Sequence, residues 1–404
     1  MDPKSIGTTI AELRKNCGIT QTELAEKLNI SNKTVSRWEN GLGFPEITQF
    51  PLLAKVFGVT VDYLMTGDKK GVCIAGNILA DIIKNIDYYP DMGLLTTIRE
   101  IKMSVGGCVP NTAINLAKID KTLPISVIGK VGKDEYGKFV LSELSRFGIN
   151  CERVTVSKDA PTSFTDVMNE PSGERTFFHA RGANAEFSPK DIDIDSINSQ
   201  ILHIGYILLL DSFDEEDKEY GTVMARFLHD VQSRGIKTSI DVVSESRPDF
   251  KDKMVPAFKY CNYVIINEVE ASMVSDIPAY NEKGELDKNN IRKMMEFIAS
   301  KGVKDKVIIH CKPAGFCYDV ETGEFTAVAS LNIPKSEIKG SVGAGDTFCA
   351  ATLYGLYNNF EDKQILEFAS SAAACNLFAE NSVDGMKPKA EIEKMDEIYG
   401  RLKI

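Results

Sequence analysis

The sequence predicts an α/β domain with a parallel sheet covered by helices, preceded by a small all-α domain. From residue 72 onward, short apolar runs alternate with helical segments over more than 300 residues, which is typical of buried parallel strands. Residues 5–66 show only short helical patterns. The polar, turn-prone residues 67–70 separate the two parts. We therefore expect a first domain at 1–67, a linker at 68–71 and a second domain at 72–404.

The composition is that of a globular protein in a reducing compartment. Of the 404 residues, 43% are hydrophobic and 26% are charged, and no apolar run is long enough to span a bilayer. The N-terminus lacks the basic and apolar regions of a signal peptide. Nine cysteines without a spacing framework indicate reduced thiols, and the four histidines show no zinc-ligand spacing. We expect a cytoplasmic protein without a zinc site.

The charge is unevenly distributed along the chain. The net charge is −11, which argues against nucleic acid as a partner of the whole surface. Residues 1–70 contain 9 Lys and Arg against 8 Asp and Glu, a balance of +1 that leaves −12 for the remainder. A near-neutral first domain on an acidic body is the asymmetry expected if only the first domain meets DNA.

Capping residues mark the short helices of the first domain. Thr20 and Glu23 form a capping-box pattern at the start of one helix. Ser31 can cap the next helix, expected over 32–40. Two further short helices are expected at 47–57 and 61–65.

Polar side chains crowd the helix at 32–40 and the start of the helix before it. In a helix-turn-helix arrangement these positions meet base edges and phosphates. The alternative is that the same side chains are only a solvated surface. The candidate DNA-binding residues are Gln21, Asn32, Lys33, Thr34, Ser36 and Arg37.

Residues 18–67 resemble the Cro/phage-repressor (XRE) helix-turn-helix family over their full length. The pattern TQxELAxxLxISxxTVSRWExGxxxP carries the resemblance. It implies binding to double-stranded DNA, and a homodimer, because such domains read paired half-sites. Trp38 and Glu39 are expected to stabilise the domain and not to touch bases.

The segment Val342–Phe348 predicts an anion site in the second domain. Gly343, Ala344 and Gly345 place main-chain N–H groups without large side chains just before an apolar helix. Phosphoryl transfer needs such a cradle, and Asp346 beside it can accept the proton of an attacking hydroxyl. Alone, the Gly-Ala-Gly-Asp run could equally be a helix cap.

Other polar and glycine-rich positions follow predicted strands, where α/β sheets bind ligands. They are Asp81 after the first strand, Gly107 and Asn111 before a helix, the turn 129–137, the run 182–184, and Asn267 with Glu270 after a buried strand. Carboxylate and amide oxygens of the last pair suit magnesium, with Glu270 acting through water. Three stretches that alternate apolar and polar residues, 97–105, 163–169 and 175–180, predict a small separate sheet.

Together these motifs resemble the ribokinase-like (pfkB) carbohydrate kinase family over about residues 72–395. The motifs GGxxxN, GxVGxDxxG, NxxE and GAGD occur in the family's order. The resemblance implies a doubly wound, mainly parallel sheet with a β-sheet lid, and the use of ATP and Mg²⁺. It implies that Asp346 is the base, that the amides of 343–345 form the anion hole, and that Asn267 and Glu270 serve the phosphates and magnesium. By the same resemblance, Asp81, Gly107 and Asn111 bind the sugar.

Some positions depart from the family pattern. Gly340 and Ser341 stand where Asp-Thr is usual, which puts a monovalent cation in doubt. Residues 242–244 do not continue the common DxNxR motif, so an unphosphorylated sugar is favoured over a sugar phosphate. Gly315 matches a turn near the nucleotide, and Asn376 is a further candidate for the nucleotide pocket.

Two principal functions remain open from the sequence. The first is an active ATP-dependent kinase that couples sugar phosphorylation to DNA binding. The second is a transcriptional regulator whose kinase-like domain only senses a sugar or nucleotide. The intact Asp346 favours the first, because a sensor needs no base. A sugar, a 2-keto-3-deoxy acid and a nucleoside all remain possible acceptors.

Overall fold

Five short helices form the N-terminal part of the computed structural model, which describes residues 3–57, 59, 61–66, 69–245 and 247–404. The helices are α1 (Pro3–Asn16), α2 (Gln21–Leu28), α3 (Asn32–Glu39), α4 (Phe50–Phe57), which follows the 3₁₀ turn η1 (Ile47–Gln49), and α5 (Val61–Thr66). Thr20 and Glu23 make the expected capping box, and Ser31 caps α3 by accepting the Thr34 N–H. Ile10, Val35 and Trp38 are buried in the core that the helices share.

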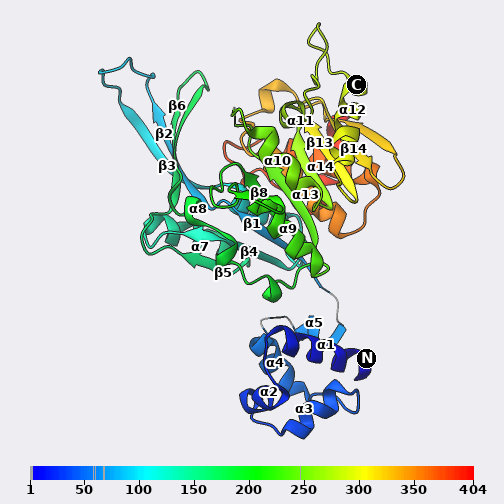
Figure 1. Cartoon of the computed structure of the whole chain (residues 1–404). Helices are drawn as coiled ribbons and strands as arrows, with labels where there is room; N and C mark the ends of the chain where they lie inside the picture. The colour runs from blue at the N-terminus through cyan, green and yellow to red at the C-terminus, as the bar shows by residue number, and fades with distance from the viewer. Residues whose placement is uncertain (1–2, 58, 60, 67–68, 246) are drawn as a thin grey trace. The chain divides into compact units, whose positions relative to one another are not determined.

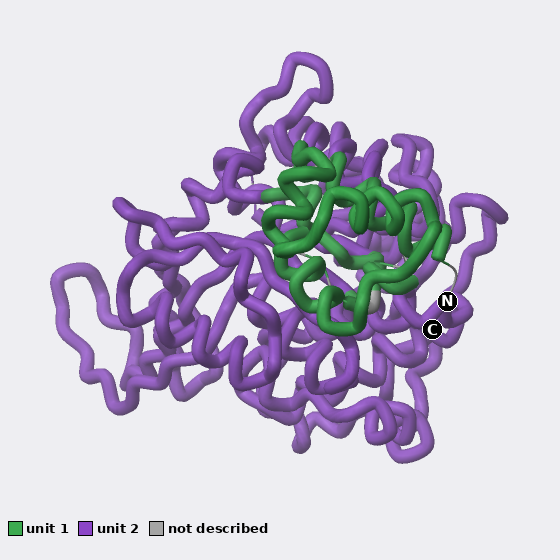
Figure 2. The backbone as a smooth tube through the Cα atoms, turned by 90° about the horizontal axis from the view of Figure 1, so that it is seen from below, with its two compact units in different colours: residues 1–71, 193–200 green, residues 72–192, 201–404 purple. Residues whose placement is uncertain are grey.

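Chain contacts divide the protein into two units, coloured separately in Figure 2. One comprises residues 1–71 with 193–200, and the other residues 72–192 with 201–404. The expected domain boundary at 67 and the first linker residue, 68, lie outside the described residues. The helical unit confirms the all-α architecture expected for the first domain.

The Glu39 carboxylate joins the first three helices. Arg14 of α1 donates from Nε to Glu39 Oε1 at 2.6 Å and from Nη2 to Oε2 at 3.0 Å. Gln21 of α2 donates to Oε2 at 2.9 Å. The side chains of Arg14 and Glu39 are only 12% and 7% exposed, so each would lose a needed partner if the other were removed.

Within the described residues, nine strands of the second unit form one sheet in the order β15-β14-β13-β12-β11-β8-β1-β4-β5 (Figure 1). All neighbours from β13 to β5 pair in parallel, while β13, β14 and β15 pair antiparallel. The bounds are β1 Val72–Gly76, β4 Ile125–Val131, β5 Asn150–Val156, β8 Ile201–Ile207, β11 Lys237–Val242, β12 Tyr263–Asn267, β13 Lys306–Cys311, β14 Ala314–Asp319 and β15 Phe325–Ala329.

Helices cover both faces of this sheet, which confirms the doubly wound arrangement. On one face lie α6 (Cys108–Ile119), α7 (Glu135–Arg146), α13 (Ala344–Tyr357) and α14 (Asp362–Asn376). On the other lie α9 (Val223–Ser233), α10 (Phe250–Phe258), α11 (Glu268–Ser275) and α12 (Lys288–Ser300). The shorter helices are α8 (Gly182–Glu186), α15 (Lys389–Ile392) and α16 (Met395–Tyr399).

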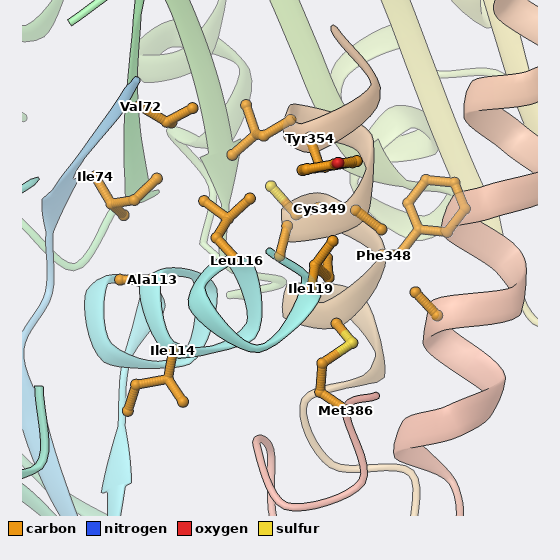
Figure 3. Packing of buried hydrophobic residues seen from close by; sticks show 14 of the residues in the cluster. Val72, Ile74, Ala113, Ile114, Leu116, Ile119, Phe348, Cys349, Tyr354 and Met386 are labelled. Atoms are coloured by element: carbon orange, nitrogen blue, oxygen red, sulfur yellow. The ribbon is translucent and has the colours of Figure 1, made fainter. Parts of the chain in front are cut away.

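Apolar packing between α6 and α13 fixes the helix that carries the Gly-Ala-Gly-Asp run. Figure 3 shows Leu116 and Ile119 of α6 in one apolar layer with Cys349 and Tyr354 of α13. Leu116 is fully buried, and burial of one such side chain stabilises by about 2 kcal/mol. This layer sets the position of the α13 N-terminus against the ends of the strands.

A second sheet, in the order β3-β2-β6-β7, forms the expected lid. Its strands are β2 (Leu79–Ile86), β3 (Ile98–Gly106), β6 (Ser163–Asn169) and β7 (Arg175–Ala180), and β2, β3 and β6 extend beyond the main sheet in Figure 1. Strand β2 was not predicted from the sequence, and Asp81, expected just after the first strand, lies within β2. Only residues 77 and 78 separate β1 from β2, so the apolar pattern runs on without a visible turn.

Of the helices in the described ranges, none combines the length and the apolar character needed to cross a membrane.

We predict that Arg14→Ala lowers the free energy of unfolding of the N-terminal unit by about 3 kcal/mol, because it leaves the buried Glu39 carboxylate unpaired. The measurement is urea unfolding of the full chain followed by the fluorescence of Trp38, the only tryptophan in the sequence. Lys55→Ala, an exposed change in α4, is the control and should leave the midpoint unchanged. Equal midpoints for both variants would contradict the bracing role of Glu39.

Candidate active site

The first turn of α13 begins at a glycine that no other residue could replace without a clash. Gly343 has φ +76°, in the left-handed region that favours glycine. A Cβ at this position would lie 2.3 Å from the Ser382 Cβ atom. The Asn376 side chain donates to the Val342 carbonyl at 2.7 Å and holds the residue before the glycine. The loop that leads into α13 is therefore held from two sides.

The main-chain N–H groups of this turn can receive an anion. Those of Gly343 and Gly345 have no acceptor within the described part of the chain. The Ala344 N–H donates to the Ser341 carbonyl at 3.3 Å, so one of the three expected amides is engaged in a long hydrogen bond. The first N–H groups of a helix carry partial positive charge and lack partners inside the helix. The turn thus has the chemistry of a phosphate cradle.

Asp346 lies in the same turn and is only 6% exposed. Its Oδ1 accepts the Tyr206 phenol at 2.5 Å, and its Oδ2 accepts the Asn111 amide at 2.8 Å. Burial raises the pKa of Asp346 to about 6, although the two hydrogen bonds act to lower it. At neutral pH the group is therefore mostly ionised and can accept a proton from a hydroxyl.

Three further carboxyl groups interact with Asp346, directly or through one another. Burial is the main cause that raises the pKa of Asp81 to about 7 and that of Glu270 to about 7. Burial, followed by the charges of Glu270 and Asp346, raises the pKa of Asp241 well above its usual value. The charges of Asp81 and Asp241 interact with that of Asp346, and the charge of Glu270 interacts with that of Asp241, so carboxyl groups of the kind that bind magnesium lie near the start of α13.

Asp81 belongs to a row of polar side chains across the lid. Strand pairing places Ser104, Asp81, Thr165 and His179 side by side on β3, β2, β6 and β7. Paired residues of adjacent strands point to the same face of a sheet. His179 Nδ1 and Thr165 Oγ1 lie 3.1 Å apart, and the Asp81 charge interacts with Asp346. The Asp81 end of the row therefore lies near the start of α13.

Gly107 and Asn111 lie at the start of α6, and the Asn111 side chain contacts Asp346. Gly107 is the N-cap of α6 with φ +85°, and Asn111 is 4% exposed. The Asn111 Nδ2 group is bound to Asp346, whereas its Oδ1 atom is buried without a partner in the described structure. A buried amide oxygen without a donor fits an incoming hydroxyl. The structure thus brings both residues, predicted to bind a sugar, next to the predicted base.

Asn267 and Glu270 make a capping box at the start of α11. The Asn267 side chain accepts the N–H groups of Val269 and Glu270, and Glu270 Oε2 accepts the Asn267 N–H at 2.9 Å. Glu270 Oε1 accepts the Ser244 hydroxyl at 2.7 Å. Both carboxylate oxygens are therefore occupied, and a metal ion would meet Glu270 through water unless these bonds open.

The two residues predicted near the nucleotide, Gly315 and Asn376, lie in β14 and at the end of α14. Gly315 is buried in β14, where a Cβ would come within 3.1 Å of the Phe348 ring. Asn376 is 1% exposed, and its Oδ1 atom has no partner among the described residues. His310 of β13 lies beside Gly345, and burial lowers its pKa to about 4, so the imidazole is neutral. Small and neutral groups thus flank this side of the turn.

Other motif residues have structural roles. Asp134, in the glycine-punctuated turn 129–137, caps α7 through the Gly137 N–H and accepts the Thr162 hydroxyl at 2.6 Å. Asn184 accepts the Ile78 N–H at 3.1 Å, which ties the run 182–184 to the segment between β1 and β2. These bonds hold the base of the lid against the main sheet.

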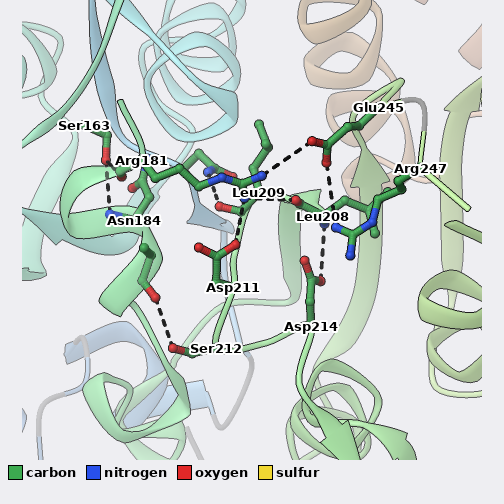
Figure 4. Close-up of polar contacts among 12 residues, drawn as sticks. Ser163, Arg181, Asn184, Leu208, Leu209, Asp211, Ser212, Asp214, Glu245 and Arg247 are labelled. Atoms are coloured by element: carbon green, nitrogen blue, oxygen red, sulfur yellow. Dashed lines mark hydrogen bonds and ion pairs between the residues drawn. The ribbon is translucent and has the colours of Figure 1, made fainter. Parts of the chain in front are cut away.

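An ionic network joins the start of α8 to the loop after β8 and to Glu245. Arg181 donates to Asp211 at 2.8 Å and to the Leu208 carbonyl at 3.2 Å, and lies 3.5 Å from Glu245 (Figure 4). The buried Asp214 accepts the Leu208 N–H at 3.3 Å in the same view. The Arg181 cation is therefore paired with protein carboxylates, and the loop after β8 is tied to α8.

Three side chains near the candidate site are of residue types that can bind a metal ion. The ligand atoms of His203, Asp241 and Cys349 all lie within 4.8 Å of one another. The His203 ring bonds to Ser239 at 3.0 Å and contacts the Cys349 sulfur at 3.6 Å. Burial raises the pKa of Cys349 well above its usual value, so the thiol keeps its proton and the contact is a hydrogen bond within the core.

The predicted DNA-binding side chains gather on α2 and α3. Asn32 and Arg37 are exposed, and so is Lys33. Asn32 donates to the Thr22 hydroxyl at 2.8 Å, which aligns the starts of the two helices. Gln21 donates to Glu39, so its amide is partly engaged. Thr34 and Ser36 are half-buried. Trp38 is buried in the core, in agreement with its expected structural role.

Three residues that build the site were not predicted from the sequence. Tyr206 donates to Asp346, Ser382 packs against Gly343, and Asn115 donates to Thr347 at 3.2 Å and to the Ser382 carbonyl at 3.1 Å. The polar Asn115 in the apolar helix α6 was a visible signal. Tyr206 and Ser382 stand in segments without a motif, so no local pattern pointed to them.

Comparisons with known protein families match both parts of the chain. The model of the pfkB family of carbohydrate kinases matches residues 69–389. A helix-turn-helix family model matches residues 10–64.

Among curated relatives, the 5-dehydro-2-deoxygluconokinase of Geobacillus kaustophilus is 27% identical over 304 residues, which cover 72% of this chain and 84% of the relative. The ribokinase of Schizosaccharomyces pombe is 24% identical over 295 residues, or 71% of this chain and 85% of the relative.

Solved structures share the fold. The Arabidopsis thaliana ribokinase complexed with ribose and ATP superposes with a TM-score of 0.66 at 20% identity, over 81% of this chain and 98% of that structure. The Thermotoga maritima ribokinase gives a TM-score of 0.65 at 19% identity, over 81% and 99%. These likenesses show a ribokinase-like fold for the second unit.

We predict that Asp81→Asn raises Tm more at pH 8 than at pH 5. The pKa of Asp81 is raised to about 7 in the folded chain, against about 3.9 for a free side chain. The folded state therefore holds a proton that the unfolded state has lost, so wild-type stability falls as the pH rises through this window. Thermal unfolding at both pH values measures the effect. An equal gain at pH 5 and pH 8 would contradict it.

Proposed function

The chain belongs to the pfkB family of carbohydrate kinases, and we propose that it transfers the γ-phosphoryl group of ATP to a hydroxyl of a sugar or sugar-like acceptor, coupled to DNA binding by its helix-turn-helix domain. The observation that carries the proposal is the geometry of one turn. The Asp346 carboxylate and the unpartnered N–H groups of Gly343 and Gly345 belong to the same start of α13. A base and an anion cradle thus stand side by side.

In this mechanism the acceptor lies between the lid and α6. Asp81 and the Asn111 Oδ1 atom bind its hydroxyl groups, and Gly107 allows close approach to the main chain. Asp346 accepts the proton of the attacking hydroxyl. The amides of the α13 turn stabilise the negative charge that develops on the phosphoryl oxygens. Positioning and charge stabilisation supply most of the rate enhancement in phosphoryl transfer.

ATP and Mg²⁺ are the proposed cosubstrate and cofactor. The Arabidopsis ribokinase of the same fold is complexed with ribose and ATP, which supports a nucleotide here. Magnesium would supply positive charge on the phosphates and would lie near Asp241 and Glu270, the latter through water. Asn267, Gly315 and Asn376 border the space proposed for the phosphates and the base of the nucleotide.

The N-terminal unit is proposed to bind operator DNA as a homodimer, because helix-turn-helix domains read paired half-sites. If the acceptor or nucleotide changes DNA affinity, linkage requires that DNA change the affinity for that ligand by the same factor. Such coupling would let the availability of a sugar control transcription.

We predict that Asp346→Asn lowers kcat at least 100-fold, because general base catalysis contributes about 10²–10⁴-fold. The assay is ADP release from MgATP with a panel of neutral sugars, 2-keto-3-deoxy acids and nucleosides. Isothermal titration of ADP into the same variant should give an affinity near that of the wild type. Near-wild-type turnover would show that Asp346 is not the base.

The same panel of acceptors distinguishes an active kinase from a protein whose kinase-like unit only senses a ligand. If the wild-type chain turns over no acceptor but binds a sugar tightly, the second unit is a sensor and the kinase proposal is wrong.

We predict that Lys33→Ala and Arg37→Ala each weaken binding to an operator selected by the wild-type chain from random duplex DNA. Loss of one phosphate contact should reduce the slope of log affinity against log salt by about 1, whereas loss of a base contact should relax specificity at one position. Lys293→Ala, exposed on α12 of the other unit, is the matched control. DNA affinity unchanged in both variants would remove this face of α3 from the interface.

A further inference from the structure

Tyr206 places a hydroxyl on the proposed base. The residue lies near the end of β8, and its phenol donates to Asp346 Oδ1 at 2.5 Å. Its own N–H donates to Asn77 Oδ1 at 2.8 Å, and Asn77 Nδ2 donates to the Leu209 carbonyl at 3.1 Å. The backbone on either side of the phenol is thus anchored to the segment after β1. The anchored end of β8 thus holds the Tyr206 hydroxyl against the Asp346 carboxylate.

Both oxygens of Asp346 carry a donor from the protein. Tyr206 occupies Oδ1, and Asn111 occupies Oδ2. A phenol O–H and the O–H of a sugar are the same kind of donor to a carboxylate, and such charge-assisted bonds are short and strong. The Tyr206 hydroxyl therefore occupies one of the acceptor positions of Asp346 that an attacking hydroxyl would use.

The surroundings offer the phenol no comparable second partner. Besides Asp346, the charged or polarisable groups that act on Tyr206 are Asp241 from β11 and Cys108 from α6. Among the described residues, the Tyr206 phenol makes its hydrogen bond to Asp346 and none to Asp241 or Cys108. The hydrogen bond to Asp346 is thus the one that the local chemistry favours.

We propose that Tyr206 is a positioning residue that occupies the base until an acceptor arrives, so that the acceptor hydroxyl replaces the phenol on Asp346 Oδ1. This inference rests on the proposed kinase function. Its consequence is protection of ATP against water. With Oδ1 open, a water molecule could donate its proton to Asp346, its oxygen would bond to the γ-phosphorus, the bond to the β-phosphate oxygen would break, and ADP and phosphate would leave. Water is a weak competitor for an oxygen that already holds the phenol.

The test is Tyr206→Phe in the full chain. Removing the hydroxyl leaves the ring in place and frees Oδ1 for water. We expect acceptor-free ADP release from MgATP to rise about tenfold, the value of one hydrogen bond to a charged group. The KM of the acceptor should fall, because its hydroxyl no longer displaces the phenol. A purely structural defect would instead lower the acceptor-free rate and raise KM.

Tyr399→Phe is the matched control. The Tyr399 phenol also donates to a carboxylate, Glu337, at 2.7 Å, in an exposed position of the same unit. This variant should keep the wild-type rate without acceptor. The double variant Tyr206→Phe/Asp346→Asn should lose the excess hydrolysis, because water then lacks its base.

The outcomes are distinct. If the wild type phosphorylates an acceptor but folded Tyr206→Phe shows no excess hydrolysis, the role of Tyr206 is wrong and the kinase function stands. If no acceptor is phosphorylated and neither protein releases ADP, both proposals fail. Should Tyr206→Phe lose cooperative unfolding, Tyr206→Met, which also lacks the hydroxyl, is measured with the same expectation.

Discussion

The burial of the Asp346 carboxylate at the start of α13 is the constraint on which the rest of the second unit depends. A buried ionised carboxylate is costly unless donors surround it. Here Tyr206 from β8 and Asn111 from α6 supply them, and the N-terminal end of a helix adds a favourable partial charge. The apolar layer between α6 and α13 keeps these three elements in register. Packing thus sets the electrostatics of Asp346, the proposed base.

Around the candidate site, several polar side chains both stabilise the fold and are placed to contact ligands. Asn267 and Glu270 cap α11 and are also candidate ligand contacts, and Asn376 holds the loop that leads into the start of α13. Asp134 caps α7 and binds the base of the lid. Residues that would contact ligands are therefore also those that define where the helices begin. A substitution at any of them is expected to change both stability and ligand contacts.

The N-terminal unit follows a different design. Its order depends on one buried carboxylate, that of Glu39, which receives donors from α1 and α2, while the cationic residues of α3 stay on the surface. The uneven charge of the chain fits this division, since the first 70 residues carry +1 and the rest −12. Electrostatic repulsion should keep the acidic unit away from DNA and leave the contact to the helical one.

Local patterns in the sequence were sufficient for much of the architecture. Apolar periodicity predicted the buried parallel strands, and capping residues such as Thr20 and Ser31 predicted where helices begin, because both depend on neighbours within a few positions. The Gly-Ala-Gly-Asp run predicted the cradle and its base for the same reason. Strand β2 was not predicted, because only two residues separate it from β1 and no turn pattern marks its start.

The tertiary structure determined the contacts between segments that are distant in the sequence. Tyr206 and Asp346 are 140 residues apart, and Asn111 and Asp346 are 235 apart, so no local pattern could pair them. The lid row of Asp81, Thr165 and His179 depends on strand register, and the raised pKa values of the acidic cluster depend on burial by the whole fold. The sequence by itself determined the elements and the reactive groups. Only folding determined which of those groups share a hydrogen bond, because that depends on the relative placement of elements that local preferences leave open.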